Sequence, residues 1–197
     1  LVALDAPGTD PSIPAVNMDV AQGAEAVVAH FSGLGHTRTA YLDGSTGTDT
    51  LMVRRQAFLE AAERYGIEVL PGNVASSMID VSSASDEFSR NWPAWEASGV
   101  TALACATDTQ AFGVLHAARH LGIRIPHRLA VAGFDDLPYS ATSNPSITSV
   151  QLHATEVGRQ AALKLRELID GQTPQSLQSM LPSSLVVRGS TTADGGL

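Results

Sequence analysis

The chain has 197 residues and a formal net charge of −8, because 20 Asp and Glu outnumber 12 Lys and Arg. Its residues are 44% hydrophobic and only 16% charged, which is enough apolar material for a substantial core and too little charge for a disordered chain. The acidic balance argues against nucleic-acid binding by these residues. No apolar run approaches the roughly 18 residues of a membrane span. The single cysteine, Cys105, excludes an internal disulfide and a thiolate zinc site.

The chain opens on an apolar run, residues 1–4, which predicts a strand that ends at Asp5 and at the turn signal Pro7-Gly8. The first residue is not Met, and the N-terminus lacks the basic region and cleavage pattern of a signal peptide. We therefore expect a cytoplasmic protein, and a sequence that begins inside a core element of a longer chain.

Helical and strand patterns alternate in the first half of the chain. The helices show apolar residues three or four positions apart, and the strands are short apolar runs. In chain order, the predicted elements are a helix capped by Asp19 and ended by Gly33 and Gly35, a strand at 39–42, a polar loop at 43–49, a helix ended by Gly66, a strand or strand lead-in at 67–70, and a helix that opens at 82–86 and runs through Trp95.

The same alternation continues in the second half, where the signals are clearer. Thr107 and Gln110 form a capping box for the fourth helix, and residues 129–134 are apolar enough for a strand buried on both faces. The remaining elements are a strand at 100–105, a long loop through Pro138 and Pro145, a strand at 147–150, a helix ended by Asp170-Gly171, and a strand at 185–187. This order predicts βαβ crossovers and a parallel sheet covered on both faces.

Ligands of open parallel sheets bind beyond the carboxyl ends of the strands, and several polar residues fall there. They are Asp5, Asp43, Thr107, Asp108, Asp135 and Asp136, with Arg54 near the start of a helix. Carboxylates accept hydrogen bonds from hydroxyl groups and arginine donates a planar fork, so the set suits a polyhydroxylated ligand. Taken singly, Thr107, Asp108 and Asp49 are better explained as helix caps; their shared sheet edge favours a site.

Signatures of enzymes are mostly absent from the sequence. There is no Gly-x-Ser-x-Gly motif, and the glycine-rich loop 44–48 lacks the Lys of a phosphate-binding loop. His116 and His120 are four residues apart but have no third ligand in a metal-binding pattern, and Cys105 lies within an apolar strand as a core residue. The sequence favours binding over catalysis, and we expect no cofactor and no metal.

Three stretches together resemble the effector-binding domain of the LacI/GalR family of bacterial transcription regulators. The first comprises VNMD at 16–19 and GLGHTRTAY at 33–41, and the second is RRQAF at 54–58, with Ala57 where the family usually has Gly. The third is the most specific: GIRIP at 122–126, AVAGFDD at 130–136 and NPSITSV at 144–150. The resemblance covers nearly the whole chain, roughly residues 1–190.

This resemblance implies an α/β fold of the periplasmic-binding-protein-like type, with two doubly wound parallel-sheet lobes linked by crossover strands. Residues 1–17 and 149–176 would belong to an N-terminal lobe that is incomplete in this chain. Residues 18–148 and 177–190 would form the C-terminal lobe. The family's helix-turn-helix DNA-binding domain is absent here.

The resemblance also implies a function and a set of ligand-binding residues. The chain would be the effector-sensing and dimerisation domain of a regulator, would bind a small sugar-like or sugar-acid ligand between the lobes, and would meet DNA only through the absent helix-turn-helix. The implied ligand-binding residues are Asp5, Arg54, Val81 (or its neighbour Asp80), Thr107, Asp135 and Ala154. At Val81 and Ala154, some members of the family carry aromatic residues.

Two other functions remain open at this stage. A solute-binding protein for sugar transport shares the fold and would need a secretory signal before Leu1. A small sugar-modifying enzyme could use Asp135 or Asp108 as a base, although nothing in the sequence requires it.

Overall fold

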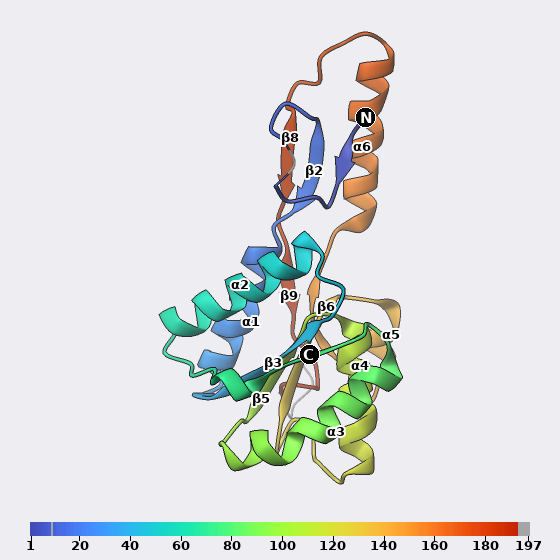
Figure 1. Cartoon of the computed structure of the whole chain (residues 1–197). Helices are drawn as coiled ribbons and strands as arrows, with labels where there is room; N and C mark the ends of the chain where they lie inside the picture. Colours follow the sequence, from blue (N-terminus) through green and yellow to red (C-terminus); the bar gives the residue numbers. More distant parts are fainter. Residues whose placement is uncertain (9, 193–197) are drawn as a thin grey trace.

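The computed structural model describes residues 1–8 and 10–192, which form two α/β lobes of unequal size (Figure 1). The larger lobe is built on a six-stranded sheet in the order β4-β3-β5-β6-β7-β9, and each neighbouring pair is parallel except β7 and β9. Its strands are β3 (Thr39–Gly44), β4 (Val74–Ser77), β5 (Ala102–Cys105), β6 (Ala130–Asp135), β7 (Thr148–Gln151) and β9 (Ser184–Val186).

Two pairs of helices cover the two faces of this sheet, which is why its central strands are apolar on both sides. One pair is α1 (Val20–Gly33) and α2 (Asp49–Arg64); the other is α3 (Val81–Ala97) and α4 (Asp108–His120). The side chains of Asp19, Thr48, Asp80 and Thr107 accept a hydrogen bond from the backbone near the start of the helix that each precedes. All four helices therefore begin at a short polar side chain, as N-cap preferences require.

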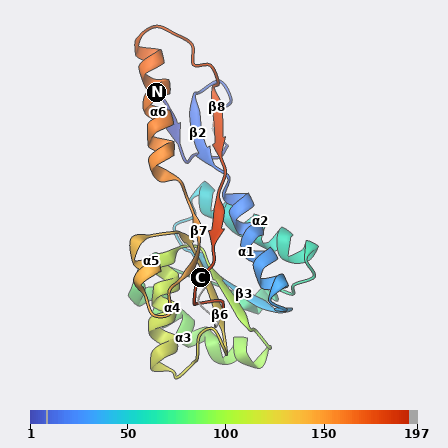
Figure 2. The ribbon, with the colours of Figure 1, turned by 180° about the vertical axis from the view of Figure 1, so that it is seen from behind.

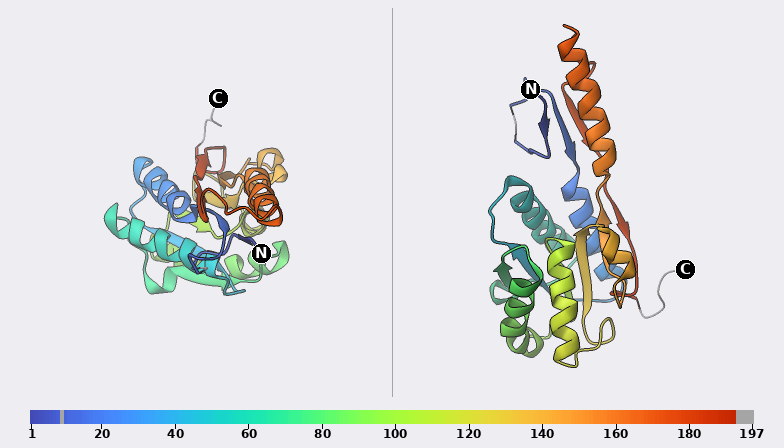
Figure 3. Two further views of the ribbon diagram at one scale, coloured as in Figure 1. Left: turned by 90° about the horizontal axis from the view of Figure 1, so that it is seen from above. Right: turned by 90° about the vertical axis from the view of Figure 1, so that its right-hand side faces the viewer.

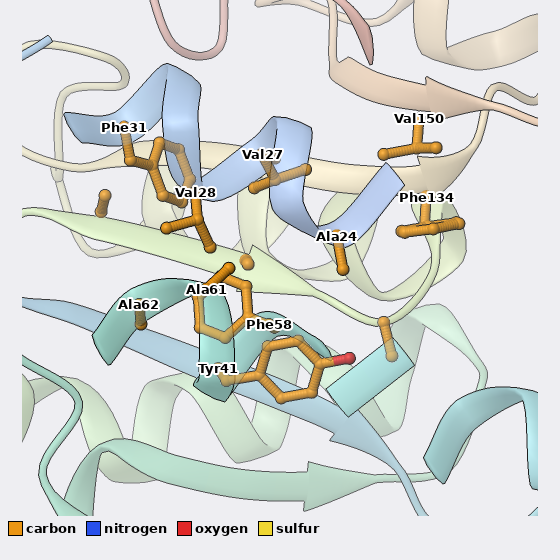
Figure 4. Close-up of a cluster of buried hydrophobic side chains, with 14 of the residues drawn as sticks. Ala24, Val27, Val28, Phe31, Tyr41, Phe58, Ala61, Ala62, Phe134 and Val150 are labelled. Atoms are coloured by element: carbon orange, nitrogen blue, oxygen red, sulfur yellow. The ribbon is translucent and has the colours of Figure 1, made fainter. Parts of the chain in front are cut away.

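Alternation along the strands divides the core of the larger lobe into two clusters. Ala102 and Ala104 of β5 face α1 and α2, whereas Leu103 and Cys105 face α3 and α4. Figure 4 shows the first cluster, in which Phe58 of α2 lies against Tyr41 of β3 with the ring centroids 4.9 Å apart. Burial of each such large apolar side chain contributes about 1.5–3 kcal/mol to folding.

The smaller lobe is a three-stranded parallel sheet packed against one helix (Figure 2). Its elements are β1 (Ala3–Leu4), β2 (Ala15–Met18), β8 (Gln178–Leu181) and α6 (Ala154–Ile169), and the strand order is β1-β2-β8. Val157 and Ala161 of α6 pack on Val16 of β2. This lobe contributes Asp5, the residue directly after β1, to the region between the lobes.

The chain crosses between the lobes three times, from β2 to α1, from β7 to α6 and from β8 to β9 (Figure 3). The first and third crossings are hydrogen-bonded to each other. Ser183 Oγ donates to the backbone oxygen of Asp19 over 2.6 Å, and Ser183 N donates to Gln22 Oε1 over 3.0 Å. The crossings therefore form a short, joined connection rather than separate linkers.

The predicted α/β fold with parallel sheets is confirmed, but some predicted elements lie elsewhere. Of the two alternatives for residues 67–70, a strand or a strand lead-in, the structure has the lead-in. Only Glu68 forms an isolated bridge, with Arg38, and strand β4 follows after a 3-10 turn at Pro71–Asn73. The loop expected between β6 and β7 contains a short helix, α5 (Pro138–Thr142). Strand β8 was missed, because its sequence, QSML, is half polar and lies at the edge of a small sheet.

The lobe boundaries expected from the resemblance also differ from the sheet topology in three places. Met18 was expected in the larger lobe but ends β2, in the smaller sheet. Residues 149–151 were expected in the smaller lobe but belong to β7, in the larger sheet. Residues 178–181 were expected in the larger lobe but form β8, which pairs with β2 in the smaller sheet. The chain returns to the larger sheet only at β9.

Gly133 of β6 gives a test of this packing. A Cβ atom there would lie 2.1 Å from Oδ1 and 3.2 Å from Cα of the buried residue Asp108. We expect Gly133→Ala to lower the free energy of unfolding, measured by urea titration, by about 1–3 kcal/mol.

The matched control for this exchange is Gly158→Ala. Gly158 lies inside α6, where no atom would approach the new Cβ within 4 Å. This control should stabilise the chain by up to about 1 kcal/mol, because alanine favours the helix. Equal stability of Gly133→Ala and the parent would contradict the close approach of α4 to β6.

Candidate functional site

A cavity of about 310 Å³ lies beyond the carboxyl ends of β3, β5 and β6, and its walls come from both lobes. It is lined by Asp5, Thr46, Thr48, Thr50, Leu51, Arg54, Ile79, Thr107 and Asp135. Six of these nine residues carry a hydroxyl or carboxyl group, and the others are one arginine and two aliphatic residues. The volume is at the lower end of the range of small-molecule sites.

Arg54 of α2 is buried beneath this cavity, with 6% of its side chain exposed. Its Nη1 donates to the backbone oxygen of Ala106 and to Oδ1 of Asp135, the latter over 3.3 Å. Its guanidinium carbon lies 3.8 Å from the centroid of the Phe134 ring, a cation–π contact. Contacts on several sides hold the guanidinium in one place, so its remaining donors are presented in a fixed geometry.

Asp135 closes β6 and carries the carboxylate nearest to Arg54. Burial raises the pKa of Asp135 to about 6, an effect that Arg54 opposes and the nearby Asp108 reinforces. Its backbone φ is 109°, and that of Asp136 is 51°, so two non-glycine residues in succession adopt positive φ. Such conformations cost about 1–3 kcal/mol each and cluster at functional sites.

Asp108, the first residue of α4, holds the turn at Asp135 and Asp136 through hydrogen bonds to the residues around it. Its carboxylate accepts hydrogen bonds from Leu137 N at 2.9 Å, from Ser140 Oγ at 2.5 Å and from Ser149 Oγ at 2.6 Å. Ser149 Oγ in turn accepts from Asp136 N at 3.0 Å. Burial raises the pKa of Asp108, and its hydrogen bonds oppose that rise. Its role is to hold the segment after β6 rather than to line the cavity.

Four threonines line the cavity, and one of them, Thr50, connects the two lobes. Thr50 Oγ1 donates to the backbone oxygen of Asp5 over 3.1 Å, which joins α2 to the smaller lobe. Asp5 itself has a φ of 46°. Thr107 Oγ1 accepts from Gln110 N at 3.3 Å, so Thr107 caps α4 as the sequence predicted, and it also lines the cavity. The reciprocal half of the predicted capping box differs, because the Gln110 side chain donates to Asp43 O and to Ser77 Oγ.

The structure brings together four of the six ligand-binding residues expected from the sequence. Asp5, Arg54, Thr107 and Asp135 line the same cavity. Val81 is the first residue of α3 and Ala154 is the first residue of α6, and neither belongs to the described lining.

Two of the strand-end carboxylates have partners outside the cavity. Asp43 pairs with Arg55, with 3.4 Å between Oδ2 and Nη1, and Asp136 pairs with Arg188, with 2.7 Å between Oδ1 and Nη2. Both pairs lie at the same sheet edge as the site. Position at a strand end therefore does not by itself place a carboxylate in the cavity.

Sequence reasoning missed Ile79 and the threonine-rich loop that precedes α2. Asp80 is the N-cap of α3, with its side chain accepting from Ser83 N at 2.8 Å, so Ile79, the residue before the cap, lies at the cavity wall. The capping pattern of Asp80 and Ser83 was the signal that could have moved the expectation from Val81 to Ile79. Thr46 and Thr48 lacked any such signal, because polar loops face solvent by default.

Other kinds of site find no support in the described residues. Within residues 1–8 and 10–192, no group of three or more His, Cys, Asp or Glu is arranged to hold a metal ion. His116 and His120 lie with ring centroids 4.4 Å apart, and Nδ1 of His120 bonds the backbone oxygen of His116. No helix in the described part of the chain is both long and apolar enough to cross a membrane.

Comparisons with known proteins identify the family of this fold. Residues 28–191 match the family described as periplasmic binding protein-like domain. The chain is 28% identical over 181 residues to the HTH-type transcriptional repressor CytR of Escherichia coli (strain K12), which covers 92% of this chain and 52% of that protein. It is 28% identical over 203 residues to the HTH-type transcriptional regulator MalR of Streptomyces coelicolor, covering 99% and 57%. The chain thus spans about half the length of the curated relatives it matches.

Solved structures give the same result. A regulatory protein of the LacI family from Chloroflexus aggregans superposes with a TM-score of 0.89 at 27% identity, covering 97% of this chain and 68% of that one. The transcriptional regulator CelR in its cellobiose complex superposes with a TM-score of 0.86 at 26% identity, covering 96% and 58%.

The raised pKa of Asp135 predicts that the stability of the fold depends on pH. An acid whose pKa is higher in the folded state binds more protons when folded, so stability falls as pH rises from about 4 through 6. We expect Asp135→Asn to be more stable than the parent at pH 7.5 by about 1–3 kcal/mol, and the difference to vanish near pH 4.

Urea titrations of both proteins across this pH range measure the effect. The exposed Asp170→Asn exchange at the end of α6 is the matched control and should give no comparable gain. A parent that is the more stable protein at pH 7.5, or a difference that does not change with pH, would refute the prediction.

Proposed function

Since the chain belongs to the periplasmic-binding-protein-like family, within the LacI type of regulators, we propose that it senses a small hydroxyl-rich ligand in the cavity between its lobes. The observation that carries the proposal is the joint placement of Arg54, Asp135, Thr107 and Asp5 around one cavity. Carboxylates that accept and a guanidinium that donates are the groups that recognise a sugar's hydroxyls.

The charges of the cavity favour a neutral ligand over a sugar acid. Two carboxylates, those of Asp5 and Asp135, line it against the single guanidinium of Arg54. That guanidinium already contacts Asp135, Ala106 and Phe134. An anionic ligand would face a net negative lining, and burying a charge without a partner is costly. A neutral sugar can instead donate its hydroxyls to the carboxylates. The only other side chains in the lining are those of Leu51, Ile79 and the threonines.

A ligand in this cavity can bias the orientation of the lobes. It would contact Asp5 in the smaller lobe and Arg54 and Asp135 in the larger one, across the joined crossings at Ser183 and Asp19. A ligand shifts such an equilibrium only by its difference in affinity for the two orientations, typically about 1–3 kcal/mol. That difference would be the regulatory signal.

In the whole protein, this signal would control DNA binding and would be read by a dimer in the cytoplasm. The curated relatives are HTH-type regulators roughly twice as long as this chain, and the proposal assigns DNA contact to a helix-turn-helix rather than to these residues. The proposed role is regulatory and non-enzymatic.

Calorimetric titration with neutral pentoses, hexoses and disaccharides, and with the matching sugar acids, tests the ligand class. We expect saturable binding of a neutral sugar and at least tenfold weaker binding of its acid. Arg54→Ala and Asp135→Ala should each weaken the binding at least tenfold, because loss of a charged hydrogen bond costs about 1.5–3 kcal/mol.

Arg55→Ala is the control, since Arg55 adjoins Arg54 but pairs with Asp43 outside the cavity. Thr46→Val, on an exposed loop, removes one lining hydroxyl without touching the core and keeps the test valid if Arg54→Ala unfolds. Val81 and Ala154 remain predictions from the resemblance, which Val81→Ala and Ala154→Ser test in the same titration. Wild-type affinity in both Arg54→Ala and Thr46→Val would exclude this cavity as the binding site.

A further inference from the structure

A second concavity, of about 310 Å³, lies at the opposite edge of the larger sheet, where β6 and β7 begin. Its walls are mostly apolar: Leu115 and Ala118 come from α4, Ile123 and Ile125 from the loop that leads to β6, and Pro145 from the segment before β7. Arg119 and Asn144 complete the lining. We name this feature the α4 groove. The ligand cavity described above uses none of these residues.

The rim of the α4 groove is basic in a chain that is acidic overall. Residues 109–134 contain no Asp or Glu, although the net charge of the chain is −8. The cationic and histidine residues of this segment are all exposed: His116, Arg119, His120, Arg124, His127 and Arg128. Charge is therefore segregated along the chain, since half of the histidines and three arginines fall in the segment that supplies five of the seven lining residues of the α4 groove.

Most of this positive charge is not neutralised within the chain. Arg128 pairs with Glu96, with 2.7 Å between Nη2 and Oε1. Arg119 and Arg124 have no ion pair with any described residue, whereas Arg90, Arg159 and Arg166 on other helices each pair with a carboxylate one turn away. Of these two arginines, Arg119 belongs to the lining of the groove, and Arg124 stands in the sequence between two lining residues, Ile123 and Ile125.

We propose that the α4 groove docks an acidic peptide segment of a partner protein. An apolar side chain of the segment would enter the groove, and carboxylates on either side of it would meet Arg119 and Arg124. Burial of the apolar side chain would give affinity. The guanidinium–carboxylate pairs would orient the segment and speed its association.

Nucleic acid and small anions fit this surface less well. Binding to a phosphate backbone depends on rows of cations that contact successive phosphates, and here the centre of the surface is an apolar concavity. A single small anion would require donors that converge on one point. The free arginines are instead spread along the rim, on α4 and on the loop after it, so they match several carboxylates spaced along a chain.

Fluorescence anisotropy with defined peptides tests the proposal. The probes are labelled peptides of about twelve residues in which Glu and Asp flank one central Leu, Phe or Met. We expect saturable binding of at least one of them to the full chain, weakening as salt is raised, as charge pairing requires. Arg119→Glu combined with Arg124→Glu should raise Kd at least tenfold, and so should a serine at the central position of the peptide.

The matched control reverses two exposed arginines of the smaller lobe, Arg159→Glu with Arg166→Glu, and should leave Kd unchanged. Ile123→Ser, which removes part of the apolar wall, should weaken binding without any change in charge. Any of three results would overturn the proposal: no saturable binding by any of the peptides, equal binding by the Arg119/Arg124 variant, or a short DNA duplex that binds more tightly than the peptides and displaces them. Sugar titrations with the same variants report separately on the ligand cavity.

Discussion

The buried carboxylate of Asp108 determines how the carboxyl edge of the larger sheet is arranged. It collects hydrogen bonds from the segment after β6, from α5 and from β7, and it approaches β6 so closely that only glycine fits at position 133. Through Ser149 it also fixes the backbone of Asp136. Asp135 is thereby held in a strained conformation beside Arg54, so the geometry of the ligand cavity depends on a residue that does not line it.

The cavity is assembled from components that each disfavour folding. A carboxylate is partly removed from water, a guanidinium is buried, and Asp5, Asp135 and Asp136 all adopt positive φ. The surrounding contacts offset these costs, and a bound ligand would satisfy the carboxylates that the folded chain leaves in excess. Groups that reduce the stability of the fold but are retained are typical of functional sites.

The sequence predicted those parts of the structure that local chemistry controls. Asp19 and Thr107 begin helices because their side chains satisfy backbone N–H groups, and Asp135 and Thr107 reach the site because parallel strands end at one edge. Strands β4 and β8 escaped prediction because edge strands need little apolar sequence. Ile79 escaped because its place depends on where α3 begins, and element boundaries are set by tertiary packing as much as by local sequence.

The three crossings between the lobes also govern the order in which the chain can fold during synthesis. Strand β2 has its partner β8 far along the chain, with Ala15 opposite Gln178. The parallel strands β3 to β7 are complete well before β8 leaves the ribosome, which delivers the N-terminal residues first. The smaller lobe therefore closes late, beside a larger sheet that lacks only β9. Until then β2 has an unpaired edge, which makes this stage the most exposed to misassembly.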